Sequence, residues 1–96
     1  MIKPRTNMLL TGKDILEMSE DTVVYVNVNR LYLRLAMASH ETNIDYDAIQ
    51  IIKTVLNRVN DEGKMFIEMA VSEIKMCFGA TLIDMPYNSF RKRRTT

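Results

Sequence analysis

Residues 45–60 carry the clearest alternation of apolar and polar positions in the chain. Their apolar residues recur every three or four positions, which places side chains on one face of an α-helix. Asp45 and Asp47 stand at the start, where a carboxylate caps the first turn and meets the positive end of the helix dipole. The pattern predicts an amphipathic helix whose buried face comprises Ala48, Ile52, Val55, Leu56 and Val59.

Residues 64–78 form a second apolar stretch, which follows the turn-like segment 60–63. Gly63 suits the left-handed conformation that ends a helix, and Gly79 suits the end of a following helix. The pattern therefore predicts one helix over residues 64–78. Apolar residues would cover about two-thirds of its circumference, which is more than one face of a small core requires.

Three methionines and a phenylalanine give this predicted helix a candidate protein interface. Met65, Met69 and Met76 fall on one stripe, and Phe66 belongs to the same apolar surface. Methionine is flexible and polarizable, so it suits surfaces that adapt to partners. Two interpretations stay open: the residues fill an irregular core, or they form a face for a protein partner or a second copy of the chain.

Residues 19–42 fit two kinds of structure. The run Val26–Asn29 alternates as a strand does, and two short strands would account for a β element within residues 22–35. Ser19, in contrast, precedes two acidic residues, as at the start of a helix. We predict a helix here, above all from Arg30 onward. Its apolar stripe would consist of Val24, Val28, Leu31 and Leu35.

The two ends of the chain are predicted to be less regular. Pro4 blocks helix formation near the start. Thr11 and Asp14 resemble a capping box, which predicts a short helix from Gly12 to Met18. Pro86 excludes a continued helix near the C-terminus, so the chain from Ala80 onward is expected to be extended.

These elements predict a mainly α fold, namely one small domain of three to four helices. Its parts are an N-terminal arm (1–10), a helical body (11–79), and an extended segment with a basic tail (80–96). A chain of 96 residues is long enough for one core but offers little material to enclose a deep active-site cavity.

Cysteine content and hydropathy indicate the compartment in which the protein is expected. The chain has one cysteine, so no disulfide forms within it. Its first residues lack the apolar run of a secretory signal, and no segment is long and apolar enough to span a membrane. The expected location is the cytoplasm of the producing or infected cell, with no membrane association.

Charge is segregated along the sequence. Six basic residues lie at the two ends, whereas residues 7–90 hold seven basic and twelve acidic residues and carry a net charge of −5. Such a body repels phosphate, and the ends attract it. Candidate residues for binding nucleic acid or an acidic surface are Arg91, Lys92, Arg93 and Arg94 of the tail, with Arg30 and Arg34 of the body.

Three interpretations of the tail stay open: a solvated segment, a phosphate-binding arm, or a latch onto an acidic protein surface. Tyr87 and Phe90 precede it, and aromatic residues beside arginines can stack on unpaired bases. If the tail binds nucleic acid, removing residues 91–94 should abolish binding without unfolding the body.

Candidate chemistry is sparse. His40 is the single histidine, and Cys77 lies between apolar residues, where a cysteine behaves as a small buried hydrophobe. No spacing of the twelve acids matches a calcium loop or singles out a catalytic pair. We therefore predict no catalytic residues, no metal, no cofactor, no small-molecule substrate and no enzymatic activity.

The predicted function is a non-enzymatic protein-binding module, namely a small regulator, inhibitor or assembly subunit that uses the apolar faces of residues 30–40 and 64–78. Self-association as a homodimer is part of this hypothesis. The small size and the many methionines suggest a viral or mobile-element origin. The alternative is an RNA- or DNA-binding accessory protein that holds phosphate with the basic tail.

Overall fold

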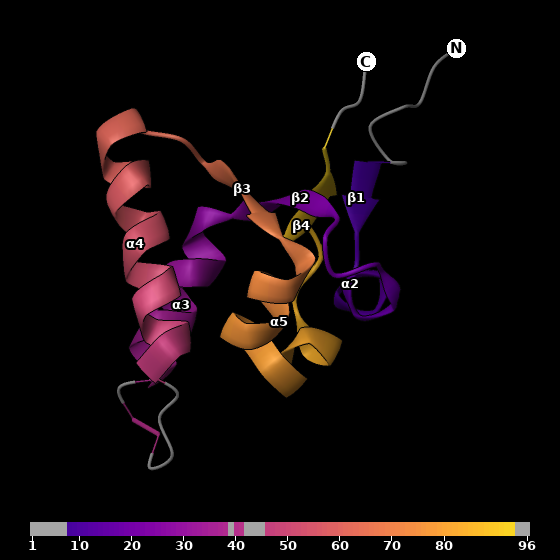
Figure 1. The fold of residues 1–96 in the computed structure, drawn as a ribbon, viewed down its shortest axis with the longest axis horizontal. Helices are drawn as coiled ribbons and strands as arrows, with labels where there is room; N and C mark the ends of the chain where they lie inside the picture. Colours follow the sequence, from indigo (N-terminus) through magenta and orange to yellow (C-terminus); the bar gives the residue numbers. More distant parts are fainter. Residues whose placement is uncertain (1–7, 39, 42–45, 94–96) are drawn as a thin grey trace.

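The computed structural model describes residues 8–38, 40–41 and 46–93, which form a mixed α/β fold (Figure 1). Four strands and five helical segments alternate along the described chain. In order they are β1 (Leu9–Leu10), α2 (Gly12–Glu17), β2 (Val23–Asn27), α3 (Val28–Ala38), α4 (Tyr46–Glu62), β3 (Phe66–Ala70), α5 (Val71–Phe78), the 3-10 helix η1 (Gly79–Asp84) and β4 (Phe90–Lys92).

The strands form one antiparallel sheet in the order β1-β4-β2-β3. The longest pairing joins β2 to β3, from Val23 opposite Ala70 to Asn27 opposite Phe66. Helices α3 and α4 connect these two strands as a helical hairpin beside the sheet (Figure 1). Strand β4, the last in sequence, lies between β1 and β2. The C-terminal strand therefore pairs with the N-terminal strand.

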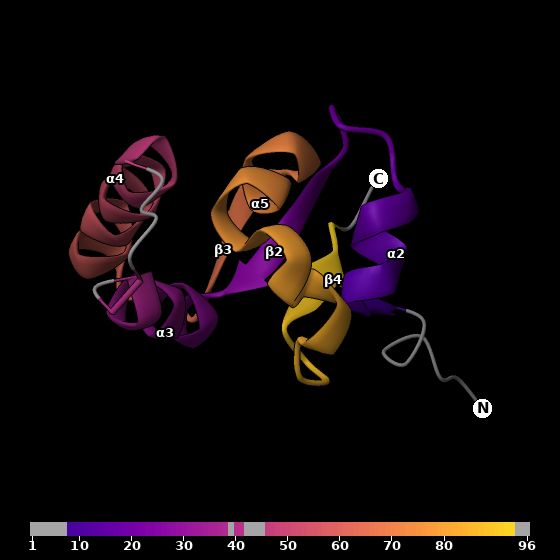
Figure 2. The same ribbon diagram turned by 90° about the horizontal axis from the view of Figure 1, so that it is seen from below.

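The core lies on the side of the sheet that α5 covers (Figure 2). Val24 and Val26 of β2 and Phe90 of β4 are buried there, because side chains alternate between the two faces of a strand. The Phe90 ring meets the Phe78 ring edge-on, with 6.0 Å between centroids. This contact places α5 on the core side, and α2 packs against α5 and η1.

The prediction of a mainly α fold is wrong, and the largest error concerns residues 64–78. Phe66–Ala70 is strand β3, and helix α5 begins only at Val71. The Glu73 carboxylate accepts a hydrogen bond from the Ala70 N–H at 3.2 Å, which helps the helix begin there. Gly79 ends α5 as predicted, with a φ of 54°.

Residues 19–42 combine the two structures that the pattern allowed. Val23–Asn27 forms β2, so the short β element is present, and the helix from Arg30 onward is confirmed within α3. Asn27 marks the change, since its side-chain oxygen accepts a hydrogen bond from the Asn29 N–H at 2.9 Å. Such a local bond favours the start of a helix.

The predicted extended C-terminal segment and tail are also corrected. Residues 79–84 form η1, and residues 90–92 are the inner strand β4. Phe90 is fully buried, so it anchors the segment that carries the basic run. Arg91 and Lys92 therefore belong to the folded sheet. Arg94 and the first seven residues, including Pro4, lie outside the described residues.

Two helix predictions are confirmed. The Thr11–Asp14 capping box is present, with Thr11 N–H donating to the Asp14 carboxylate and Asp14 N–H donating to the Thr11 hydroxyl. The apolar face of α4 is buried as predicted at Ala48, Ile52, Val55, Leu56 and Val59. Within the described residues, no helix has both the length and the apolar character needed to cross a membrane.

Candidate nucleic-acid interface

The face of the sheet opposite the core carries a row of mixed side chains. Arg91 of β4 lies opposite Leu9 of β1 on one side and opposite Tyr25 of β2 on the other. Tyr25 in turn lies opposite Glu68 of β3. Because directly opposed residues share a face of an antiparallel sheet, these four side chains form one row across four strands.

Two aromatic rings lie on this outer face. Tyr25 and Phe66 are both partly exposed, whereas Val24, Val26 and Ile67 between them are buried on the core side. The guanidinium carbon of Arg91 lies 4.3 Å from the centre of the Phe66 ring, which is a cation–π contact. The contact holds a flat cationic group beside the two rings.

The outer face also has an ion pair. Arg93, directly after β4, has its Nη1 atom 3.6 Å from the Glu68 carboxylate. About half of each side chain is exposed. Such a pair in solvent contributes little to stability. The two groups are therefore available for contacts with a ligand at little cost to the fold.

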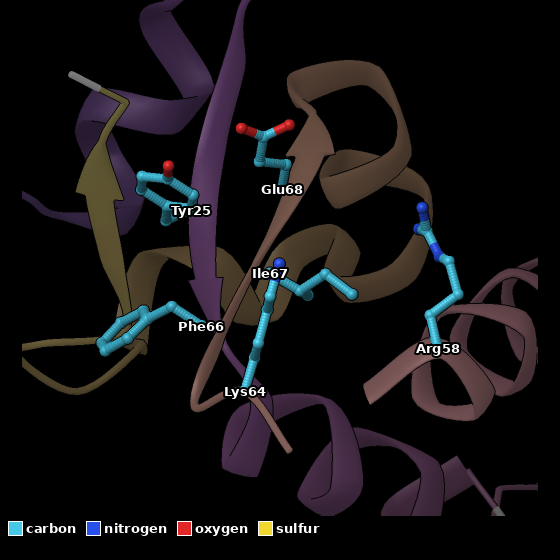
Figure 3. Close-up of a pocket in the computed structure, with 6 residues that line it drawn as sticks. All are labelled: Tyr25, Arg58, Lys64, Phe66, Ile67 and Glu68. Atoms are coloured by element: carbon cyan, nitrogen blue, oxygen red, sulfur yellow. The ribbon is translucent and has the colours of Figure 1, made fainter. Parts of the chain in front are cut away.

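A hollow of about 420 Å³ lies beside these residues (Figure 3). In Figure 3, Tyr25 and Phe66 lie to one side of β3, and Arg58 extends from α4 on the other side. Lys64, just before β3, points along the strand between them. The lining consists of Tyr25, Arg58, Lys64, Phe66, Ile67 and Glu68.

Charge on this face is mainly positive. Arg58 and Lys64 line the hollow with Glu68, Arg93 pairs with Glu68, and Arg91 lies opposite Tyr25. A flat positive surface with exposed rings suits a negatively charged ligand that has flat groups.

The fold brings only some of the predicted basic site residues to the outer face. Arg91 and Arg93 reach the outer face, whereas Lys92 lies opposite Val24 and has the opposite orientation. Arg30 and Arg34 belong to α3, away from this face. In Figure 1, α3 lies beside α4, next to the sheet.

Arg34 has a structural environment instead. Its Nε donates to the Cys77 carbonyl at 2.7 Å, and its Nη1 pairs with Glu41. The group therefore ties α3 to the end of α5. The Arg30 Nε atom is buried and has no hydrogen-bond partner among the described residues.

The predicted methionine stripe does not exist as a surface. Met69 is buried in β3 with 2% of its surface exposed, whereas Met65 is 64% exposed and Met76 is 47% exposed. Met65 precedes β3 and Met76 lies on α5, so the two do not share a helix. Phe66 is the one residue of this predicted set that lines the hollow.

Sequence reasoning missed Tyr25, Glu68, Lys64 and Arg58 as site residues. The alternation of Val24 and Val26 around Tyr25 was a usable signal, since it places Tyr25 opposite the core if residues 23–27 form a strand. Glu68 and Arg58 gave no such signal, because only the pairing of β2 with β3 and the position of α4 bring them near Tyr25.

A second hollow, of about 400 Å³, lies between α3 and η1. Leu33 and Met37 of α3 contribute to it, and each is more than half exposed. They lie four positions apart and so share a face of the helix. The complete lining is Arg30, Leu33, Arg34, Met37, Phe78, Thr81, Asp84, Met85 and Pro86.

The remaining chemical groups lie away from both hollows. His40 is exposed, and Cys77 is fully buried, with its Sγ 3.9 Å from the Ala48 carbonyl. Hydrogen bonds from the Thr11 backbone and side chain lower the pKa of Asp14, which completes the capping box at the start of α2. Among the residues that the structure describes, no three His, Cys, Asp or Glu side chains are grouped as a metal site would require.

Comparison of the chain with protein-family models, with curated proteins and with solved structures found no match in any of the three. The outer sheet face and the α3–η1 hollow are therefore the features of the molecule that indicate a function.

Proposed function

We propose that the protein binds single-stranded nucleic acid on the outer face of its sheet. The observation that carries the proposal is the register of β4, which places Arg91 beside Tyr25 and above Phe66. Proteins that bind single strands combine basic side chains along the backbone with aromatic rings on which bases stack. This face has both in adjoining positions.

Several features favour a single strand over a duplex. Bases can stack on an exposed ring or on a guanidinium plane only when they are unpaired. Tyr25 offers a ring, and Arg91 above Phe66 offers a cationic plane. Arg58 and Lys64 line the hollow beside them, where they can neutralise phosphates.

Point substitutions are the appropriate test, because deleting residues 91–94 would remove two of the three residues of β4. That strand joins β1 to β2, so the deletion would be expected to disrupt the sheet. The loss of binding after such a deletion would not separate a role in binding from a role in folding.

Fluorescence anisotropy with a labelled oligothymidine of about 12 nucleotides provides the measurement. Tyr25→Ala should weaken binding between about fivefold and about 150-fold, because a base loses its stacking partner. Tyr46→Ala, which changes an exposed tyrosine at the start of α4, is the matched control and should bind as the wild type does.

The salt dependence should identify the phosphate contacts. Arg58→Ala and Lys64→Ala should each lower the slope of log affinity against log salt by about 0.7, and Lys53→Ala on α4 should leave it unchanged. Binding that is independent of salt, or equal in Tyr25→Ala and the wild type, would contradict the proposal. Stronger competition by a duplex than by a single strand would also contradict it.

A second candidate function is self-association through α3, and the α3–η1 hollow favours it. The occupant we propose for the hollow is the same face of a second copy. Leu33 and Met37 would pack against their equivalents, and the rim carries both Arg30 and Asp84. In a two-fold arrangement the Arg30 of each copy can meet the Asp84 of the other, since a symmetric patch must be self-complementary.

Sedimentation analysis over a range of protein concentrations tests this second candidate. The wild type should form a dimer, and Met37→Arg should raise the dimer dissociation constant at least about tenfold, because it places a charge in the apolar centre. Met76→Arg, at a comparably exposed methionine of α5, is the control. A wild type that stays monomeric throughout, or equal effects of the two substitutions, would contradict it.

A further inference from the structure

We infer that the outer sheet face selects guanine within the bound single strand, and that Glu68 and Arg93 recognise the base edge. The inference rests on the proposed function, since it names the base that the same face would accept. It starts from an apparent conflict, because a carboxylate lies within a surface otherwise suited to phosphate.

Glu68 lies where it would oppose backbone binding. It lines the hollow together with Arg58 and Lys64, and half of its side chain is exposed. A carboxylate there repels a phosphate and weakens the attraction of the neighbouring cations. Its position is better suited to a group that donates hydrogen bonds, and base edges have such groups.

The sheet register places this carboxylate beside a stacking ring. Tyr25 and Glu68 are directly opposed in β2 and β3, so their Cβ atoms are about 4.5–5.5 Å apart. In Figure 3 the Tyr25 ring and the Glu68 carboxylate lie on adjacent strands and extend toward the same end of the hollow. A base stacked on the ring would therefore turn an edge toward Glu68.

Arg93 adds donors next to this acceptor. Its Nη1 atom lies 3.6 Å from Glu68 Oε1, so a carboxylate and a guanidinium stand side by side. The ion pair is half exposed and not part of the core. Its two groups can thus exchange their contact with each other for contacts with a base.

Guanine fits this pair better than the other bases do. Its Watson–Crick edge has two adjacent N–H donors, which a carboxylate can accept together, next to a carbonyl oxygen that a guanidinium can contact. Thymine and uracil have one N–H between two carbonyl oxygens, and these oxygens would face the carboxylate. Cytosine and adenine have one amino donor beside a ring nitrogen acceptor.

The test compares labelled oligothymidine with the same oligomer carrying central guanines, and with a third oligomer in which hypoxanthine replaces guanine. The wild type should bind the guanine oligomer at least about fivefold more tightly than the thymine oligomer. Hypoxanthine lacks the exocyclic amino group, so it should lose most of this preference.

Two variants assign the preference to Glu68. Glu68→Gln should reduce the guanine preference to less than about twofold, and it should strengthen the binding of oligothymidine, because one negative charge that repels phosphate is removed from the face. Glu17→Gln, at an exposed glutamate of α2, should keep the preference of the wild type.

The outcomes separate this inference from the proposed function. Salt-dependent binding of all oligomers with equal affinity would overturn guanine selection and leave single-strand binding intact. Failure to bind any oligomer would overturn both. If free GMP displaced the guanine oligomer at an equal concentration of base, the result would support guanine recognition and contradict the binding of a strand.

Discussion

At the scale of single residues, Gly12 shows how much of the fold depends on distant contacts. A Cβ atom at this position would lie 1.6 Å from the carbonyl oxygen of Leu82, which belongs to η1. Helix α2 therefore approaches η1 so closely that only glycine fits. The sequence predicts Gly12 as the start of a helix. Leu82, however, lies about seventy positions further along the chain, and no sequence pattern links the two residues.

Gly12→Ala is accordingly expected to destabilise the protein by about 1–3 kcal/mol or more, because the clash is with backbone atoms that cannot rotate away. Gly63→Ala is the matched control. Gly63 has a φ of 66° but no atom within 4 Å of an added Cβ, so its expected cost is only the strain of about 1–2 kcal/mol. Urea unfolding measures both, and a Gly12→Ala variant as stable as the wild type would contradict the close approach.

At the scale of secondary structure, local sequence patterns predicted the correct element only where a single pattern was dominant. The α4 face and the Thr11–Asp14 cap follow from contacts within a few residues, and both were predicted correctly. Residues 64–78 fit a helix by spacing, but in the structure the burial of Phe66–Ala70 alternates as in a strand. Pairing with β2 decides between these structures, and a partner about 45 residues away is not visible in a local pattern.

The candidate site was predicted in part for the same reason. Arg91 and Arg93 were selected from their charge, and Phe66 was selected for a different role. What brings them together is the register of β4 against β2 and the adjacent β3. Strand register depends on the packing of the whole sheet, so the sequence showed the residue types without showing their arrangement.

At the scale of the molecule, the sheet explains the segregation of charge. The basic C-terminal residues directly follow the acidic body in sequence, and β4 places Arg91 and Lys92 between β1 and β2. The core side of the sheet is covered by α5, whereas Arg91 and Tyr25 face the other side. The molecule thus has one face for packing and one face that we propose for nucleic acid.

The most direct test of this account is an NMR titration of the ¹⁵N-labelled protein with unlabelled single-stranded oligonucleotide, which locates binding on the described surface. We expect the largest changes in amide chemical shift at Tyr25, Phe66, Glu68 and Arg91, with small changes along α3 and η1. Changes confined to α3 and η1, or no changes at oligonucleotide concentrations well above that of the protein, would contradict binding at the sheet face.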